Sequence, residues 1–199
     1  MSEYDKFAVD FSATRKNGWP EFDLLAPHIS KMDRVLDLGC GNARLRKFLP
    51  VADGNYFGLD LSEKLLKIAR DEFPRDHFFL GSFEKTLPFG ADNFEIVTAI
   101  ASFHHLLSKK SQHQFFAEVF RVLKPGGILF LTTWNLPRKF FWKNFGKKNW
   151  TIPFGAEKFP RTYRKISPRE LKSLAKKFGF SVLGCTLERR KNYVLIVQK

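Results

Sequence analysis

The sequence is most informative at residues 35–43, which read Val35-Leu36-Asp37-Leu38-Gly39-Cys40-Gly41-Asn42-Ala43. An apolar run of strand length leads into a glycine-rich loop, where we expect a helix to begin. Glycine lets a backbone approach a ligand closely, and open α/β sheets bind ligands outside the carboxyl ends of their strands. Asp37 would repel a pyrophosphate but suits an ammonium or sulfonium ion. The stretch therefore favours a cationic nucleoside, rather than a nicotinamide dinucleotide, as the ligand of this loop.

Strand-length apolar runs alternate with helical patterns along the rest of the chain. Strands are expected at 34–38, 56–60, 77–80, 94–99 and 127–133, and helices at 62–72, 111–123 and 168–178. This alternation predicts an α/β fold with a doubly wound parallel sheet. Two last runs, 181–187 and 192–197, are separated by only four residues. Because a crossover needs more, we expect them to form an antiparallel hairpin.

Asp60 ends the second predicted strand, 23 residues after Asp37. A carboxylate at that place and distance suits hydrogen bonds to the hydroxyls of a ribose. The alternative is an acidic residue that stabilises a helix N-terminus, because the helix predicted at 62–72 follows at once.

The composition is that of a soluble protein. The chain has 199 residues, of which 44% are hydrophobic and 27% charged, which excludes a disordered or fibrous chain. No apolar run approaches the roughly 18 residues of a membrane span, and the N-terminus does not resemble a secretory signal. Two cysteines, Cys40 and Cys185, are too few for a disulfide framework or a structural zinc site. We therefore expect a cytoplasmic location, with Cys40 as a packing residue rather than a nucleophile.

The net charge of +14 is concentrated in the C-terminal third. Residues 1–135 hold 17 basic and 17 acidic side chains, whereas residues 136–199 hold 17 basic and 3 acidic ones. Within 136–165, eight aromatic rings are interleaved with nine basic residues. Basic groups neutralise phosphates and aromatic rings stack on unpaired bases, so this segment favours RNA as a partner. The alternatives are a solvated basic face and aromatic rings that pack the segment against the domain.

Several motifs follow one another in chain order: Asp37-x-Gly39-x-Gly41, Gly58-Leu59-Asp60-Leu61-Ser62, Leu87-Pro88-Phe89, Asn93-Phe94-Glu95-Ile96-Val97, His104-His105-Leu106 and Arg121-Val122-Leu123-Lys124-Pro125-Gly126-Gly127. Together they resemble the class I S-adenosylmethionine-dependent methyltransferases. The resemblance implies a Rossmann-like seven-stranded sheet with an antiparallel last strand, and S-adenosylmethionine as the cofactor. It also implies a cofactor-binding set, namely Asp37, Gly39, Gly41, Asp60, Leu61, Ser82, Phe83 and Ala99.

A narrower resemblance rests on Tyr4-Asp5-Lys6-Phe7-Ala8, Phe11-Ser12-Ala13-Thr14-Arg15, Trp19-Pro20, His104-His105, Trp134-Asn135 and Arg161-x-Tyr163. This combination is similar to the tRNA wobble-uridine carboxymethyl methyltransferases. Those enzymes esterify the carboxylate of a carboxymethyluridine in the anticodon. The resemblance implies the tRNA anticodon loop as a partner, together with the small zinc-ribbon activator protein used by eukaryotic members of the family.

The acceptor side of the site follows from the same resemblance. The catalytic set is Arg15, His105 and Asn135, and the substrate-binding set is Trp19, His104, Trp134, Arg138, Arg161, Tyr163 and Arg164. A histidine suits a hydrogen-bonding or base role near neutral pH, although one of the pair could instead close the strand end structurally. A carboxylate acceptor is already ionised, so catalysis needs positioning and desolvation rather than a strong base. The histidines have no partners at metal-ligand spacing, so no metal is expected.

We therefore predict one domain in four segments: an N-terminal arm or lid (1–33), a cofactor-binding core (34–135), a basic aromatic insertion (136–166), and a C-terminal helix and hairpin (167–199). The predicted function is S-adenosylmethionine-dependent methylation of a tRNA wobble uridine. Two alternatives stay open, a small-molecule methyltransferase with a hydrophobic lid and a non-catalytic RNA-binding relative. The salt dependence of substrate affinity separates a small-molecule methyltransferase from an RNA enzyme. A measurement of cofactor binding tests the non-catalytic alternative.

Overall fold

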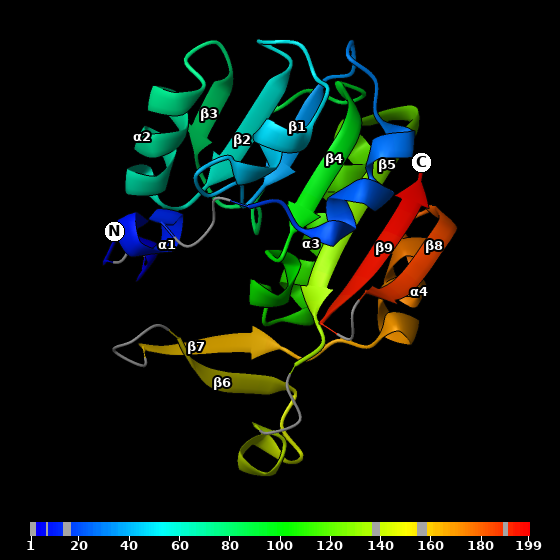
Figure 1. Cartoon of the computed structure of the whole chain (residues 1–199). Coiled ribbons are helices and arrows are strands. Elements are labelled where there is room, and N and C mark those ends of the chain that lie inside the picture. Colours follow the sequence, from blue (N-terminus) through cyan, green and yellow to red (C-terminus); the bar gives the residue numbers. More distant parts are fainter. Residues whose placement is uncertain (1–2, 7, 14–16, 137–139, 155–158, 189–190) are drawn as a thin grey trace.

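The computed structural model describes residues 3–6, 8–13, 17–136, 140–154, 159–188 and 191–199. Seven strands form one sheet in the order β3-β2-β1-β4-β5-β9-β8 (Figure 1). They are β1 (Val35–Leu38), β2 (Tyr56–Asp60), β3 (His77–Leu80), β4 (Phe94–Ile100), β5 (Leu123–Trp134), β8 (Ser181–Glu188) and β9 (Asn192–Gln198). The pairs from β3 to β5 are parallel, whereas β9 is antiparallel to both β5 and β8. The predicted α/β sheet with an antiparallel last strand is confirmed.

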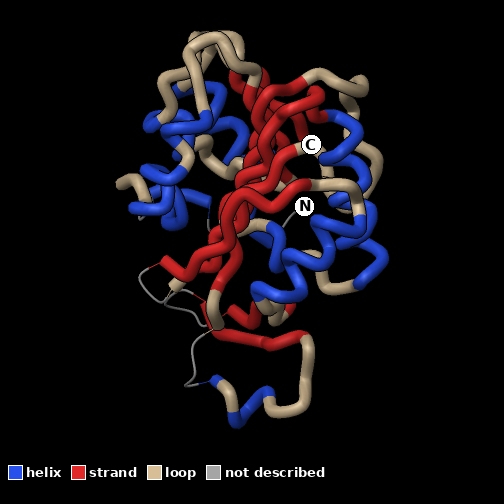
Figure 2. Tube along the Cα trace, turned by 90° about the vertical axis from the view of Figure 1, so that its right-hand side faces the viewer, coloured by secondary structure: helices blue, strands red, loops and turns tan. Residues whose placement is uncertain are grey.

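Helices lie on both sides of the sheet, which Figure 2 shows edge-on. One face packs against α3 (Lys109–Val122) and α4 (Pro168–Lys177), and the other against α2 (Glu63–Glu72) and the 3₁₀ helix η2 (Pro20–Leu24). A second 3₁₀ helix, η3 (Ala26–His28), follows η2 and has no buried residues. Leu36 and Leu38 of β1 belong to the first core, whereas Val35 belongs to the second. This alternation follows from the two-residue period of a strand, and it makes β1 apolar on both sides.

Serine caps set the starts of the three longer helices. The Oγ atoms of Ser62 and Ser167 accept hydrogen bonds from the N–H groups of Leu65 and Glu170, as N-caps do. The cap of α3 is Ser108, whose Oγ accepts from the Ser111 N–H at 3.0 Å. For this reason α3 begins at Lys109, two residues before the predicted start at 111. A further short helix, α1, spans Ala8–Ala13. In the part of the chain that the structure describes, no helix has the length and apolar character needed to cross a bilayer.

The glycine-rich loop after β1 is not followed by an α-helix, so the helix start predicted there is wrong. Ala43 adopts the left-handed conformation with φ of 55°, and only the five-residue 3₁₀ helix η4 (Arg44–Phe48) follows. Pro50 then favours an extended Leu49, which ends the helical turns. The loop backbone itself, rather than a helix N-terminus, is therefore what the chain presents at this strand end.

The predicted insertion contains an additional two-stranded sheet that the sequence analysis did not predict. Its strands, β6 (Asn149–Phe154) and β7 (Phe159–Arg164), are antiparallel, with Trp150 opposite Tyr163. These two residues form a small core with Leu136 and Ile152. Figure 1 places this hairpin beyond the carboxyl ends of β4 and β5.

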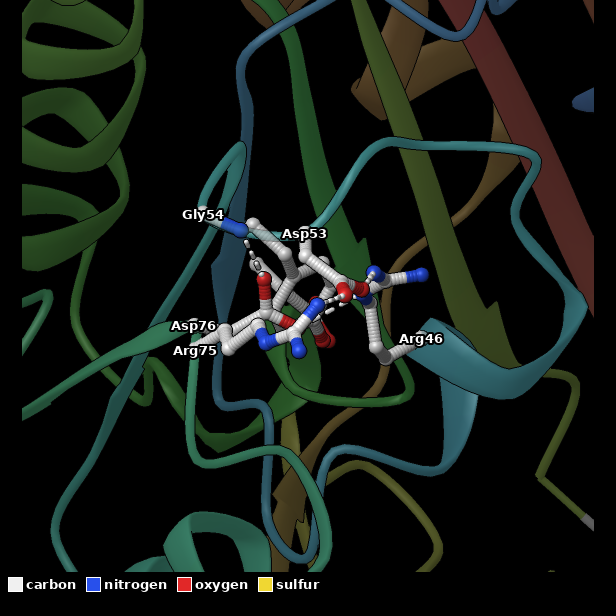
Figure 3. A network of polar contacts seen from close by, with 7 residues as sticks. Arg46, Asp53, Gly54, Arg75 and Asp76 are labelled. Atoms are coloured by element: carbon white, nitrogen blue, oxygen red, sulfur yellow. Dashed lines mark hydrogen bonds and ion pairs between the residues drawn. The ribbon is translucent and has the colours of Figure 1, made fainter.

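A network of ion pairs joins the loops that lead into β2 and β3 (Figure 3). Arg46 donates from Nε to Asp76 Oδ2 at 2.6 Å and from Nη2 to Asp53 Oδ1 at 3.0 Å. The other oxygen of Asp76 accepts the Gly54 N–H at 2.9 Å, while Arg75 binds Asp53 from the solvent side. The Arg46 and Asp76 side chains are only 9% and 2% exposed. The network therefore fixes η4, and with it the end of the glycine-rich loop, to the amino ends of these strands.

Candidate active site

A pocket opens at the carboxyl ends of β1, β2 and β4, where open α/β sheets bind their ligands. It encloses about 1000 Å³, with the solvent at its mouth included. Its walls come from the glycine-rich loop, the segment after β4, the N-terminal residues and β7. The pocket thus joins segments that lie more than 150 residues apart in the chain.

The glycine-rich loop forms one wall of this pocket because its backbone is drawn against β2. The N–H groups of Gly39 and Cys40 both donate to the carbonyl oxygen of Leu59, at 2.7 and 3.2 Å. Gly39 has a φ of +80°, and a Cβ atom there would lie 2.6 Å from the Cβ of Ser102. Glycine is therefore required at this position by both conformation and space.

Asp60 is held rigidly at the end of β2. Its Oδ2 accepts the N–H of Gly41 and its Oδ1 accepts the N–H of Ser62, each at 2.8 Å. Burial raises the pKa of this carboxyl above its usual value, and the backbone donors oppose that rise. Asp60 binds the start of α2, as the second interpretation expects, and it also lines the pocket, where ribose binding stays a prediction.

Asp37 lies deeper in the same pocket and is only 2% exposed. Its two carboxylate oxygens accept hydrogen bonds from the hydroxyls of Tyr56, at 2.6 Å, and Thr98, at 2.8 Å. Burial raises its pKa to about 6, although both hydrogen bonds act in the opposite direction. Asp37 is therefore ionised at neutral pH and supplies negative charge to an enclosed site, where a cationic ligand would stabilise it.

Another part of the pocket lining is formed by Tyr4, His105 and Arg161. The Tyr4 hydroxyl and the Arg161 Nη2 both contact His105 Nε2, at 3.1 and 3.3 Å. Because a guanidinium only donates, Nε2 acts as the acceptor and carries no proton. Burial lowers the pKa of His105 to about 4, which agrees with a neutral ring at neutral pH. Tyr4 is held here because Asp5 accepts the Ser62 hydroxyl at 2.6 Å.

His104 is more deeply buried than His105, and its hydrogen bonds are to residues of β5. It is 1% exposed, and its Nδ1 accepts the Trp134 N–H at 3.4 Å beside the Thr133 hydroxyl at 3.3 Å. Burial, with a smaller contribution from His105, lowers the pKa of His104 well below its usual value. His104 therefore closes the end of β5 while one side of its ring faces the pocket.

The structure brings together most of the residues that the sequence analysis assigned to the site. Those lining the pocket are Trp19, Asp37, Gly39, Gly41, Asp60, Leu61, Phe83, His104, His105, Trp134 and Arg161. Arg15 and Arg138 lie outside the described residues. Tyr163 does not line the pocket, but its ring packs 5.1 Å from that of His105.

Four other predicted residues lie away from the pocket lining. Ser82 accepts the Glu84 N–H at the start of a turn, and Ala99 is completely buried in the core. Asn135 accepts the Tyr193 hydroxyl at 3.1 Å, and Arg164 pairs with Glu170 at 2.9 Å. The Asn135 and Arg164 contacts join neighbouring elements, whereas the Ser82 contact lies within a single turn.

The sequence analysis missed several lining residues, which are Tyr4, Phe22, Cys40, Asn42, Arg44, Leu45, Leu65, Ile100, Ala101 and Ser102. Ile100 to Ser102 follow β4 directly, so the rule that ligands bind at the carboxyl ends of strands could have found them. Arg44 lies over the Trp19 ring, 4.2 Å from its centroid, and no sequence spacing predicts that contact. Among the described residues, no three His, Cys, Asp or Glu side chains are grouped as metal ligands would be.

Residues 36–131 match the family model of a methyltransferase domain. The fold agrees with this match. A SAM-dependent methyltransferase from Methanosarcina mazei superposes with a TM-score of 0.73 at 20% identity, covering 92% of this chain and 98% of that one. The complex between the Haloferax volcanii Trm112 methyltransferase activator and a methyltransferase gives 0.75 at 19% identity, covering 98% and 95%. Residues 36–131 therefore match the methyltransferase-domain family, and the chain has the fold of the S-adenosylmethionine-dependent methyltransferases.

The chain is also similar in sequence to curated methyltransferases. The chain is 32% identical over 132 residues to a tRNA (carboxymethyluridine(34)-5-O)-methyltransferase of Arabidopsis thaliana, and 30% identical over 138 residues to one of Xenopus tropicalis. The alignments cover 66% and 69% of this chain but 31% and 21% of those relatives, so the chain spans less than a third of their length. An uncharacterized methyltransferase of Synechocystis is 35% identical over 115 residues, which is 57% of this chain and 53% of the relative.

The pocket fits S-adenosylmethionine, the cofactor of such a domain. The cofactor carries an ammonium and a sulfonium, and the ionised Asp37 gives the pocket complementary charge, while Asp60 lines the pocket as a second carboxyl group. Gly39 keeps open the space beside Ser102 that a side chain would fill. Leu61 and Phe83 add apolar surface to the lining.

Proposed function

We propose that this protein methylates a carboxylate oxygen of a carboxymethyluridine at the wobble position of a tRNA. One observation carries the proposal: a buried cation, a buried carboxylate and a half-buried carboxylate line a single pocket. Arg161 is only 6% exposed and lines the same pocket as Asp37 and Asp60. The planar guanidinium presents parallel N–H donors, a geometry that suits a carboxylate acceptor.

In this proposal the acidic wall holds the cofactor. Asp60, fixed by two backbone N–H groups, accepts the ribose hydroxyls with its remaining lone pairs. Asp37 and the glycine-rich loop hold the methionine end, where a positive charge offsets the cost of keeping Asp37 ionised. Bound S-adenosylmethionine supplies a methyl group on a positively charged sulfur.

Tyr4, His105 and Arg161 position the acceptor. Arg161 orients the substrate carboxylate, and the Tyr4 hydroxyl and the neutral His105 ring shape the space beside it. Because a carboxylate is already ionised at neutral pH, His105 need not remove a proton, which agrees with its low pKa of about 4. Trp19 and Trp134 exclude water from the pocket. Catalysis then comes from positioning and desolvation.

The choice of tRNA is supported by two independent features. The relatives from Arabidopsis and Xenopus carry names that state tRNA carboxymethyluridine methylation. The hairpin that bears Arg161 also belongs to the basic segment, which suits a polyanionic substrate. We further infer that an activator subunit is a partner, because one structural neighbour was solved with the Trm112 activator. The cytoplasmic location expected from the sequence stays a prediction.

The test is transfer of labelled methyl groups from S-adenosylmethionine to total tRNA, with nuclease-digested tRNA as the control. We expect label in intact tRNA only, with an affinity that falls steeply as salt rises. Arg161→Gln should lower kcat/KM for tRNA by about tenfold or more, since a charged hydrogen bond is lost. Arg169→Gln, an equal charge change at an exposed position on α4, should leave it unchanged.

Absence of label would contradict the proposal if calorimetry still shows cofactor binding and the assay has been repeated with a Trm112-type activator. That result would favour the small-molecule methyltransferase. Absence of both label and cofactor binding would favour the non-catalytic RNA-binding relative.

A further inference from the structure

Two aromatic side chains in the insertion are much more exposed than aromatic rings usually are. Trp142 is 82% exposed and Phe145 is 65% exposed. Their rings are nearly parallel, with 26° between the planes and 6.1 Å between the centroids. We call this pair the Trp142–Phe145 platform. Exposed apolar surface of this kind marks an interaction surface rather than ordinary solvent-facing structure.

The platform is presented by a turn that is itself well fixed. The turn contains the 3₁₀ helix η7 (Trp142–Asn144), and the buried Asn144 side chain spans it. Asn144 donates from Nδ2 to the Phe140 carbonyl oxygen at 3.0 Å and accepts the Thr151 N–H on Oδ1 at 3.2 Å. The turn is thus tied to β6, so the two rings are held outward with little conformational entropy left to lose on binding.

The surroundings of the platform select its partner. Lys143, Lys147 and Lys148 are exposed in the same turn, and Glu157 is the one acidic residue of the sequence between 136 and 165. Flat exposed rings flanked by several cations suit an unpaired nucleic-acid strand, whose bases stack while its phosphates meet the lysines. A lipid surface would require a continuous apolar helical face, and η7 has only three residues.

The platform is connected to the pocket by packed rings. Phe141 contacts both platform rings, with centroids 5.4 Å away in each case, and also Trp150 at 6.2 Å. Trp150 pairs across the hairpin with Tyr163, whose ring packs against His105 of the pocket. In Figures 1 and 2 the turn lies at the end of the molecule farthest from the sheet, beyond the hairpin. The platform is therefore a site separate from the pocket, in the turn that precedes the β6–β7 hairpin.

We propose that the Trp142–Phe145 platform binds unpaired nucleotides of the RNA substrate by base stacking, outside the methyl-transfer pocket. The assignment of that RNA as the substrate rests on the proposed function, whereas the binding of unpaired RNA does not. One nucleotide would enter the pocket beside Arg161 while other nucleotides of the same loop stack on the platform.

The probe is a fluorescein-labelled oligouridine of twelve nucleotides, followed by fluorescence anisotropy with the full chain and no cofactor. The double variant Trp142→Ala/Phe145→Ala should weaken binding by about tenfold or more, the loss expected for one or two stacked bases. Trp142→Phe should retain most of the affinity, because a ring remains. The matched control is Leu183→Ala/Leu187→Ala, which removes two exposed apolar side chains from β8 and should change nothing.

Unchanged affinity of the Trp142→Ala/Phe145→Ala variant for oligouridine would contradict the role proposed for the platform. So would a variant that loses only its binding to anionic vesicles or its self-association. Methyl transfer to tRNA is measured in parallel. A raised KM for tRNA with kcat retained supports the platform as part of substrate binding. If the wild-type chain binds oligouridine through the platform and binds the cofactor, but methylates no tRNA even with a Trm112-type activator, the proposed function fails and the platform stands.

Discussion

Burial makes Asp37 costly to ionise, yet the pocket depends on its charge. The unfolded chain ionises this carboxyl near pH 3.8, whereas the folded chain does so only at about pH 6. Between these values the folded state binds more protons than the unfolded state, so stability falls as pH rises through this window. At neutral pH the penalty is about 3 kcal/mol at most, since each unit of pKa corresponds to roughly 1.4 kcal/mol.

This penalty can be measured with Asp37→Asn. Relative to the wild type without cofactor, the variant should gain up to about 3 kcal/mol of unfolding free energy between pH 4 and pH 7, because it has no carboxyl to ionise. It should also lose cofactor affinity. Urea denaturation at several pH values tests the first effect and calorimetry the second. A stability difference independent of pH would contradict this account of Asp37.

Individual site residues were predictable where they lie at the carboxyl end of a strand. Asp60 is the last residue of β2, Asp37 is the last but one of β1, and the glycines follow β1 directly. Tyr4 does not, because its place beside His105 depends on a contact between residues 101 positions apart in the chain. That contact in turn depends on Asp5, whose carboxylate accepts the hydroxyl of Ser62, the N-cap of α2. Only the folded chain reveals this hydrogen bond.

At the scale of elements, two glycines distinguish the effect of limited space from that of backbone conformation on stability and cofactor binding. Gly39 and Gly126 both have a φ of +80°, but only Gly39 has a neighbour where a Cβ would lie. Gly126→Ala should therefore cost roughly 1–2 kcal/mol of stability from conformation alone and leave cofactor affinity intact. Gly39→Ala should cost more and also abolish cofactor binding. Equal effects of the two substitutions on stability and affinity would refute the role given to Gly39.

The ion-pair network of Figure 3 supports a second prediction at this scale. Asp76→Ala leaves the buried Arg46 without its main partner and should destabilise the fold by about 3 kcal/mol or more. Arg75→Ala removes an ion pair whose arginine is 79% exposed, and should cost less than about 1 kcal/mol. Urea denaturation compares the two variants. Similar small losses would mean that the network does not fix η4.

The elements of the central sheet were predictable because parallel strands are buried on both sides and so appear as short apolar runs. The β6–β7 hairpin was missed although Trp150 and Ile152 alternate with polar residues, because Pro153 and Pro160 interrupt the pattern at paired positions. The prediction of a helix after the glycine-rich loop was wrong for a local reason, which is the left-handed conformation of Ala43.

At the scale of the whole molecule, the pocket lies where the two parts of the chain with different charge meet. The sheet contributes Asp37 and Asp60, and the basic hairpin contributes Arg161. This division matches the two ligands of the proposed reaction, a cationic cofactor and an anionic acceptor. The charge asymmetry was visible in the sequence, but the closure of the hairpin over the strand ends was not.

The chemical form of the product tests this arrangement most directly. Intact tRNA labelled by the wild-type enzyme is treated with mild alkali, and the volatile methanol that it releases is counted. A carboxylate acceptor gives a methyl ester, so the account predicts that most of the label leaves the tRNA as methanol. Label that resists alkali would show methylation of a base nitrogen, a base carbon or a ribose oxygen, and would contradict the role assigned to Arg161.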